Sequence, residues 1–227
     1  MSASLEFDRT TMQLTAEILT QQLELADALL AGRSQMLEPQ DLPGRYGRVV
    51  RSLDQVLAAC DCEAVVAGGW AVWRHGYIGR VTQDVDIALP KSRVEEFLKT
   101  ASVSGFSIIT QEQGHWPTLQ HRETGIDVDI LPEGGRPGTA TRPAPTTIPH
   151  PSAMGAVRGK LRYSSLLSLI ELKLAAGRLR DEADVLELAR ENRDRLDQVR
   201  VHLQAVHPQY ANRFDELLQQ VDETRCV

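Results

Sequence analysis

Two acidic segments with the same spacing constrain this chain more than any other feature. Asp84-Val-Asp86 and Asp127-Val-Asp129 each place two carboxylates two residues apart, among apolar residues. On a β-strand such residues point to the same face, about 6–7 Å apart. Like charges this close repel one another unless a cation or a proton neutralises them. If the two strands are neighbours, we expect three or four carboxylates to converge on one spot.

A cluster of this kind suits a metal site. Carboxylate oxygens, together with water, are the ligands that Mg²⁺ prefers. Two such cations a few ångströms apart can clamp the attacking and leaving oxygens of a phosphoryl or nucleotidyl transfer. The alternative interpretation of a single Asp-x-Asp is the solvent face of an edge strand. Two pairs favour the metal site, because the first also follows an apolar run that ends in Gly68-Gly69, where a backbone can approach a phosphate.

Composition excludes several classes of protein. The 227 residues carry a net charge of −6, so no overall positive field attracts nucleic acid. Three cysteines leave no even set for a disulfide framework. No uncharged run reaches the length of a membrane span, and the N-terminus lacks the order of a signal peptide. We therefore expect a reduced, soluble, cytoplasmic protein without a membrane partner.

The hydrophobic pattern predicts a mixed arrangement of helices and strands. Strands are expected at residues 63–67, 84–89, 106–110, 117–121 and 125–131. Helices are expected at residues 10–30, 46–60, 70–75, 92–100, 165–176, 182–192, 196–206 and 208–221. Ser92 with Glu95 matches a capping box, and Ser164 is the expected cap of the helix that follows it. Residues 133–160 are predicted to form a long loop, and residues 32–43 a linker.

These elements predict an α+β fold in three parts. Residues 1–42 form an N-terminal helical extension and linker. Residues 43–162 form the core, a small mixed sheet flanked by helices. Residues 163–227 form a C-terminal helical region.

Two blocks of sequence resemble the polymerase-β-type nucleotidyltransferase superfamily. Gly68-Gly69-Trp-Ala and residues 79–87 (Gly-Arg-Val-Thr-Gln-Asp-Val-Asp-Ile) are similar to its signature: a glycine pair, a short helix, then Asp-x-Asp on the next strand. The Arg-x-Thr before Asp-x-Asp and residues 172–184 resemble the AbiEii-type toxin nucleotidyltransferases. The first of these features also resembles aminoglycoside nucleotidyltransferases. The resemblance covers about residues 63–131 and 163–190, and the gap between the glycine pair and Asp84 is long for the superfamily.

The resemblance implies a role for each matching residue. Gly68-Gly69 would hold the triphosphate of an NTP, and Asp84 and Asp86 would bind two Mg²⁺ ions. Asp129 would ligate one of the metals and deprotonate the acceptor hydroxyl. Asp127 points to the same side of its strand as Asp129, so spacing alone leaves both open as the third carboxylate.

Four further residues are predicted to contact the nucleotide. Arg80 and Thr82 precede the acidic pair, and arginine suits phosphate, although a loop arginine also pairs with surface carboxylates. Lys173 lies on an apolar helical stripe, where a lysine either reaches the surface or pairs with a buried anion. The resemblance favours a phosphate contact for Lys173. Asp181 would orient Lys173 or an arginine, or is simply an acid in the first turn of a helix.

The leading hypothesis is a Mg²⁺-dependent nucleotidyltransferase that moves an NMP from an NTP to an acceptor hydroxyl and releases pyrophosphate. The resemblance implies a toxin-like enzyme with the tRNA 3′ end as one acceptor and an antitoxin as a partner. One alternative is an aminoglycoside-type enzyme that modifies a small molecule. The other is a catalytically silent protein of the same fold that binds a nucleotide or a partner.

Overall fold

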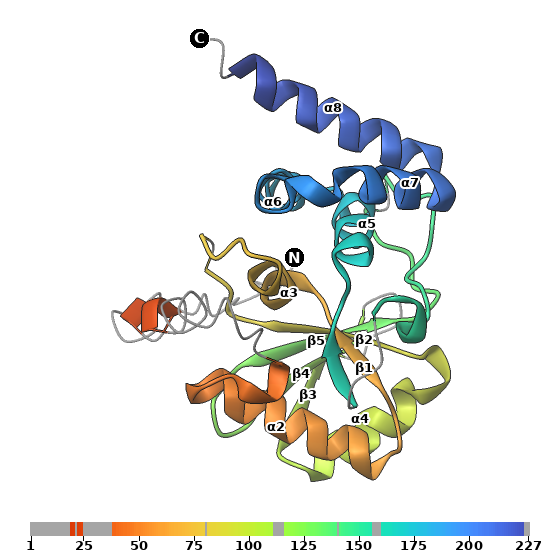
Figure 1. Cartoon of the computed structure of the whole chain (residues 1–227). Coiled ribbons are helices and arrows are strands. Elements are labelled where there is room, and N and C mark those ends of the chain that lie inside the picture. Colours follow the sequence, from red (N-terminus) through yellow and green to blue (C-terminus); the bar gives the residue numbers. More distant parts are fainter. Residues whose placement is uncertain are drawn as a thin grey trace, which may run out of the picture.

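The computed structural model has the predicted α+β fold (Figure 1). It describes residues 19–20, 22–24, 38–79, 81–110, 116–139, 141–155 and 160–224. Its strands are β1 (Ala64–Val66), β2 (Val85–Leu89), β3 (Phe106–Thr110), β4 (Thr118–His121), β5 (Asp127–Pro132) and β6 (Leu161–Tyr163). Its helices are α2 (Gly44–Ala59), α3 (Gly68–Arg74), α4 (Val94–Val103), α5 (Leu166–Ala176), α6 (Leu179–Glu191), α7 (Leu196–Val206) and α8 (Pro208–Thr224). The strands form one mixed sheet in the order β3-β4-β5-β2-β1-β6.

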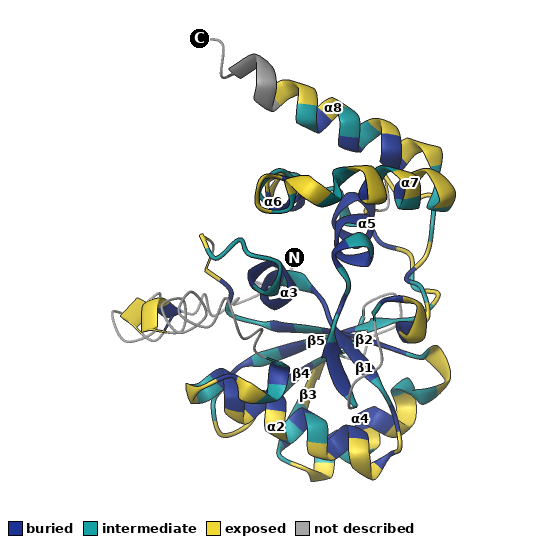
Figure 2. Ribbon diagram, in the orientation of Figure 1, coloured by how far each residue is buried: buried dark blue, intermediate teal, exposed yellow. Residues whose placement is uncertain are grey.

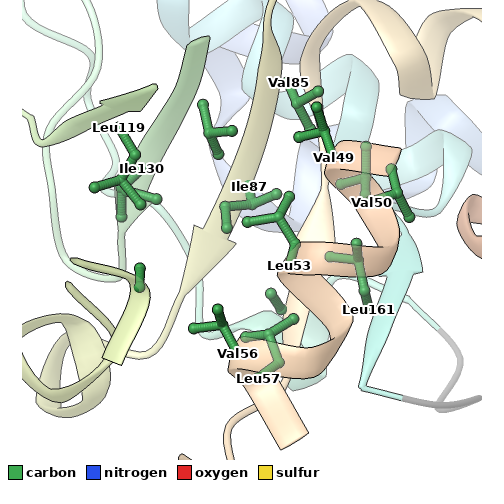
Figure 3. Packing of buried hydrophobic residues seen from close by; sticks show 14 of the residues in the cluster. Val49, Val50, Leu53, Val56, Leu57, Val85, Ile87, Leu119, Ile130 and Leu161 are labelled. Carbon is green, nitrogen blue, oxygen red and sulfur yellow. The ribbon is translucent and has the colours of Figure 1, made fainter. Parts of the chain in front are cut away.

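Helices α2 and α4 cover one face of the sheet (Figure 1). The apolar stripe of α2 consists of Val49, Val50, Leu53, Val56 and Leu57. Val85 and Ile87 of β2 point toward this stripe, as Figure 3 shows, and both are buried. Each buried side chain of this size contributes about 1.5–3 kcal/mol. Because neighbours on a strand alternate between faces, this core holds Asp86 on the opposite face.

That opposite face, which we call the open face, is covered by α3 and by the C-terminal helices. Apolar residues of helices α5, α6, α7 and α8 form a second buried cluster. Leu169 of α5 belongs to it, and so does Ala71 of α3. Leu172 of α5 packs with Ala88 at the far end of β2. Figure 2 shows α3 and α5 as largely buried segments above the sheet. The acidic positions of β2 and β5 thus lie beneath α3 and α5.

One strand was not predicted. β6 follows residues 133–160, which were expected to be a loop, and pairs in parallel with β1, with Leu161 opposite Ala64. Three residues are too few to show an alternating pattern. The pairing with β1 therefore determines this strand, and the sequence alone does not reveal it. The predicted loop also contains a short 3-10 helix, Pro151–Ala153.

Two predicted helix caps are wrong. Helix α4 begins at Val94, after a 3-10 turn and without a side-chain cap, so Ser92 and Glu95 form no capping box. Helix α5 is capped by Ser165, whose side chain accepts a hydrogen bond from a backbone N–H of the first turn. Ser164 is one residue too early. Adjacent serines offer the same chemistry, so only the direction of the backbone decides between them.

The N-terminal prediction lies mostly outside the described residues. Of the predicted helix 10–30, residues 19–20 and 22–24 are described, and they are helical. The predicted linker is described from residue 38 and contains a 3-10 helix, Pro39–Asp41. In the described parts of the chain, no helix combines the length and the apolar character that crossing a membrane requires.

Candidate active site

Two aspartates from neighbouring strands lie side by side on the open face. Strands β2 and β5 are parallel, and their register pairs Asp86 with Asp129. Neighbouring strands are about 4.8 Å apart. Asp84 immediately precedes β2, and Asp127 is the first residue of β5. The two acidic segments therefore meet, as the sequence predicts. We call these four aspartates the acidic cluster.

The carboxylates of the acidic cluster act on one another. Burial, followed by the charges of Asp84 and Asp129, raises the pKa of Asp86 to about 7. Burial also raises the pKa of Asp129, and the charges of Asp84 and Asp127 add to that rise. Asp127 has a raised pKa for the same reasons, burial first and Asp84 second. The fold thus gathers negative charge at an energetic cost, which a bound cation would remove.

Strand β4 holds two of these carboxylates in place. It is antiparallel to β5 and pairs Thr118 with Asp129 and Gln120 with Asp127. Thr118 Oγ1 donates to Asp129 Oδ1 at 2.7 Å, and Gln120 Nε2 donates to Asp127 Oδ1 at 3.1 Å. Each bond favours the charged carboxylate and so lowers its pKa, against the effect of burial. The bonds also orient the carboxylates on the open face.

Gly68 brings the backbone up to the acidic cluster. Its φ is +58°, a conformation that residues with a side chain rarely adopt. A Cβ at Gly68 would lie 1.6 Å from Asp86 Oδ2, so the contact requires glycine. The N–H of Ala67 donates to the backbone oxygen of Asp86 at 2.9 Å, which ties this turn to β2. Gly69 is buried in the first turn of α3.

Thr82 is connected to the acidic cluster by a hydrogen bond to Asp84. Its side chain is buried, and its Oγ1 donates to Asp84 Oδ1 at 3.4 Å. The carbonyl oxygen of Thr82 accepts hydrogen bonds from the hydroxyl of Tyr46, at 2.9 Å, and from the amide of Gln22. Thr82 therefore fixes the segment that carries Asp84 onto α2. Arg80, the other residue predicted before the acidic pair, lies outside the described residues.

Lys173 of α5 is buried between two aspartates of α6. Its Nζ lies 3.1 Å from Asp181 Oδ1 and 2.7 Å from Asp184 Oδ2. Both carboxylates are almost fully buried. Lys173 thus pairs with buried anions of its own chain and does not reach the surface. It also lines a cavity with Gly68 and Asp86.

Arg178 joins Lys173 and the two aspartates, and we call these four residues the ion cluster. The Nε of Arg178 donates to Asp181 Oδ2 at 2.6 Å. Burial opposes ionisation of Asp181, but this bond and the charge of Lys173 hold its pKa below the usual value. The charge of Arg178 lowers the pKa of Asp86 and of Asp129 as well. Arg178, whose side chain is 74% exposed, therefore connects the two clusters.

Two adjoining cavities lie beside these clusters. The inner cavity, of about 80 Å³, has a lining that includes Gly68, Asp86, Lys173 and Asp181. The outer cavity, of about 360 Å³, is lined by Trp116, residues 136–139, Ala176 and Arg178. Trp116 and Arg178 line both cavities. A molecule in the outer cavity would therefore be next to the acidic cluster.

The donor set of the acidic cluster suits a hard cation. Within the described residues, no three side chains of His, Cys, Asp or Glu stand in an arrangement that could hold a metal ion. Mg²⁺ does not need such a cage, because it usually takes one or two carboxylates and completes its shell with water and substrate phosphates. Asp86 and Asp129 are two facing carboxylates of this kind. The residues present therefore fit Mg²⁺ when a phosphate is also bound.

Several residues of the site, among them Trp116, Thr118 and Arg178, carry no prediction from the sequence. Trp116 and Thr118 take their places only through the pairing of β4 with β5, which no local pattern reveals. Arg178 does leave a signal. It stands three residues before Asp181, within the segment that resembles the AbiEii-type proteins, and directly precedes α6, whose first turn contains Asp181.

Part of the chain matches a known family of enzymes. Residues 49–136 match the model of the aminoglycoside-2''-adenylyltransferase family. The match contains β1 to β5 and the whole acidic cluster. The chain is accordingly a nucleotidyltransferase, as the sequence predicts, whereas the AbiEii-type branch receives no support. No curated protein sequence gives a significant match.

Several solved structures show weak similarity to this chain. ANT(2'')-Ia in complex with adenylyl-2''-tobramycin is 15% identical, with a TM-score of 0.41, over 77% of this chain and 97% of that one. An antigenic nucleotidyltransferase-like protein from Paracoccidioides brasiliensis is 14% identical, with a TM-score of 0.40, over 74% and 91%. JHP933 from Helicobacter pylori is 13% identical, with a TM-score of 0.37, over 78% and 90%. Such TM-scores support no inference about activity.

Proposed function

We propose that this nucleotidyltransferase depends on Mg²⁺ and that the acidic cluster is its catalytic centre. The observation that carries the proposal is the pairing of Asp86 with Asp129 on the open face, with the pKa of both raised by burial and by neighbouring carboxylates. Two Mg²⁺ ions bound there, with Asp84 as a further ligand, would neutralise this charge and stabilise the charge that develops on the reacting phosphate.

We assign the triphosphate of the NTP to the turn at Gly68-Gly69. The first N–H groups of a helix have no partner within the helix, and without a Cβ the backbone can approach a phosphate closely. Helix α3 has only seven residues. For that reason we attribute the contact to the N–H groups and not to a helix dipole.

Arg178, the residue directly before α6, is the cation that we expect to contact the phosphates. Two aspartates already compensate the charge of Lys173, so Lys173 and Asp181 position Arg178. This assignment differs from the sequence-based hypothesis, in which Lys173 itself bound phosphate. Thr82 positions Asp84 through its hydrogen bond. The phosphate contact of Arg80, which lies outside the described residues, stays a prediction.

In the proposed reaction, the oxygen of an acceptor hydroxyl attacks the α-phosphorus of the NTP. The bond from the α-phosphorus to the pyrophosphate oxygen breaks, and the hydroxyl proton passes to Asp129. A raised pKa suits this role, because a general base works best when its pKa lies near the working pH. Thr118 holds the carboxylate in place. Asp127, which Gln120 holds in the same way, is the alternative base.

The family match favours a small molecule as the acceptor. The matched family is named for adenylyl transfer to aminoglycosides. This supports the aminoglycoside-type alternative better than the toxin-like hypothesis. Transfer to the tRNA 3′ end and control by an antitoxin have no support in the match. We therefore place the chain among enzymes that attach a nucleotide to a small acceptor.

An assay with each α-labelled NTP, Mg²⁺ and a panel of small hydroxyl acceptors tests this function. We expect transfer of label and release of pyrophosphate, both lost when Mg²⁺ is chelated. Asp86→Asn and Asp129→Asn should each lower the rate by about 10²-fold or more, since each removes a charge on which the transition state depends. Asp194→Asn is the matched control, because Asp194 is exposed and away from the site. Transfer that persists in the Asp86→Asn/Asp129→Asn double variant would refute the proposal.

A further inference from the structure

The inner cavity is too small for a nucleoside, whereas the outer cavity is large enough. The volume of the inner cavity is about 80 Å³, and sites that hold a small molecule measure about 300–1,000 Å³. The outer cavity, of about 360 Å³, is within that range. Trp116 and Arg178 line both cavities, so the two adjoin. The outer cavity therefore offers the space that the nucleoside of an NTP needs once its phosphates lie at Gly68 and Arg178.

The order of the strands sets the direction in which an NTP lies across the site. Gly68 follows β1, and Trp116 precedes β4, while β2 and β5 stand between β1 and β4 in the sheet. Asp86 of β2 and Asp129 of β5 therefore lie between the turn at Gly68 and Trp116. An NTP with its terminal phosphates at Gly68 has its α-phosphate over these two carboxylates. Its nucleoside then lies on the side of Trp116.

Trp116 presents a fixed aromatic ring to the outer cavity. Its side chain packs against the buried cluster that contains Ile148 and Leu172. A Cβ at Gly135 would lie 3.2 Å from the indole Nε1, so the ring lies against the backbone of Gly135. Trp116 is nevertheless only partly buried, and it lines both cavities. A base can stack on such a ring, because every base has a π-face.

Arg136 adds hydrogen-bond donors to the same cavity. Its Nη1 donates to the carbonyl oxygen of Ala144 at 2.8 Å, which orients the guanidinium. A guanidinium has five N–H donors in a rigid plane, so others remain for a ligand. Both purines present N7 as an acceptor, which has no counterpart in a pyrimidine. Arg136 and Trp116 together thus favour a purine, which also has the larger ring system for stacking.

The charge of the outer cavity does not suit an aminoglycoside, the acceptor for which the matched family is named. The lining contains the guanidinium groups of Arg136 and Arg178, and its described residues include no Asp and no Glu. A polycationic aminoglycoside would meet like charge here without compensation. A neutral base meets no such repulsion. The lining therefore favours the donor nucleotide over such an acceptor as the occupant.

We propose that the outer cavity holds the nucleoside of the NTP, with a purine base stacked on Trp116 and hydrogen-bonded to Arg136. This inference rests on the proposed function and names the class of NTP that the enzyme uses. The acceptor then reaches the α-phosphorus from a side of the acidic cluster that the outer cavity does not occupy. Trp116 and Arg136 hold the base equally in the ground state and in the transition state, so they act on the affinity for NTP and not on the chemical step.

Calorimetry with two kinds of probe separates this inference from the proposed function. The full-length protein with Mg²⁺ is titrated with inorganic tripolyphosphate, which has no nucleoside. It is also titrated with the α,β-methylene analogue of each NTP, which cannot transfer its nucleotide. We expect the ATP or GTP analogue to bind at least about tenfold more tightly than tripolyphosphate and than the UTP and CTP analogues.

Substitutions at the two base contacts sharpen this test. Trp116→Leu should weaken the purine analogue by about tenfold to a hundredfold and leave tripolyphosphate unchanged. Trp116→Phe should restore most of the binding, because a phenyl ring still stacks on a base. Arg136→Gln should weaken the purine analogue by about tenfold and leave the pyrimidine analogues unchanged. Arg193→Gln is the matched control, since Arg193 is exposed and lines neither cavity.

A transfer assay distinguishes a donor site from an acceptor site. With the purine NTP, Trp116→Leu should raise the KM for NTP by the factor that calorimetry gives. The kcat and the KM for the acceptor should stay unchanged, because uniform binding of the donor is all that is lost.

The outcomes separate the two proposals. If neither tripolyphosphate nor any analogue binds, the proposed function fails. If the purine analogues bind no more tightly than tripolyphosphate or than the pyrimidine analogues, the inference is overturned and the function stands. The same holds if a Trp116→Leu variant with the melting temperature of the wild type raises the KM for the acceptor and leaves the purine analogue unchanged. Should Trp116→Leu not fold, unchanged binding of the purine analogue to Arg136→Gln overturns the inference.

Discussion

Two groups of charged side chains meet at the inner cavity. Asp86 of the acidic cluster lines it, and so do Lys173, Arg178 and Asp181 of the ion cluster. In the ion cluster Lys173 lies within 3.1 Å of both its aspartates, and the pKa of Asp181 falls below its usual value. In the acidic cluster the pKa of Asp86 and of Asp129 rises. The aspartates of the ion cluster are buried, whereas those of the acidic cluster are only half-buried, so burial alone does not explain the difference. The difference in pKa arises because Lys173 and Arg178 lie directly beside Asp181, whereas no cation lies as close to Asp86 or Asp129 among the ion pairs of the described residues.

This comparison separates a scaffold from a binding site. The ion cluster contains its own counter-charges and is complete without a ligand. The acidic cluster has only the distant help of Lys173 and Arg178, so it is least stable when empty. Ionisable groups with strongly shifted pKa values are concentrated at binding and catalytic sites. The following changes break or sharpen this distinction.

The largest effect is expected from Lys173→Met. Removal of the ammonium leaves Asp184 buried without this cation and Asp181 with Arg178 alone, which should cost about 3–5 kcal/mol of unfolding free energy. Urea denaturation at pH 8 measures the loss. The loss should shrink toward pH 4, because the pKa of Asp181, which Lys173 helps to hold down, should rise in the variant. Lys160→Met is the control, since its pair with Asp61 is exposed and contributes little to stability. Equal losses in both variants would contradict a complete ion cluster.

Asp86→Asn should stabilise the metal-free protein. The raised pKa means that folded Asp86 holds its proton more tightly than the unfolded residue, whose pKa is 3.8. The carboxylate therefore destabilises the fold fully above pH 7, and not at all well below pH 4. The gain should be about 2–4 kcal/mol at pH 8 and should vanish at low pH. Thermal unfolding with a chelator measures it, and added Mg²⁺ with NTP should raise the melting temperature of the wild type but not of the variant. A variant less stable than the wild type at pH 8 would show that the cluster is already compensated.

Arg178→Gln should affect the substrate more than the fold. Its guanidinium is largely exposed, so the loss of stability should stay below about 1 kcal/mol. The KM for NTP should rise by about tenfold, because a charged hydrogen bond to phosphate is lost. Steady-state kinetics and urea denaturation measure the two effects. A large loss of stability with unchanged KM would place Arg178 in the scaffold and not at the substrate.

The smallest effect is expected from Thr118→Val. The variant loses the hydrogen bond that favours the charged form of Asp129, so the pKa of Asp129 should rise further, by about one unit or less. The acid limb of the pH profile of kcat should move to higher pH. Gln120→Leu makes the same change at Asp127 and should leave that limb in place. If Gln120→Leu moves the limb instead, Asp127 is the general base.

Local pattern was enough to predict much of the fold. The alternation of aspartate and valine in residues 84–87 and 127–130 predicted which side chains share a face, because a strand repeats every two residues. Helix α7 spans the predicted residues 196–206. The failures were also local. β6 is too short to show a pattern, and two neighbouring serines were equally good caps for α5.

The sequence by itself determined the chemistry that this chain can offer: four carboxylates on one face and a glycine turn with no side chain to block a phosphate. Only the tertiary structure decided how that chemistry is used. It placed β5 beside β2 and left Asp86 facing Asp129, and it enclosed Lys173 between two aspartates of another helix. The reason is that spacing along the chain records which residues share a face. Which charges are neutralised depends on contacts between distant segments.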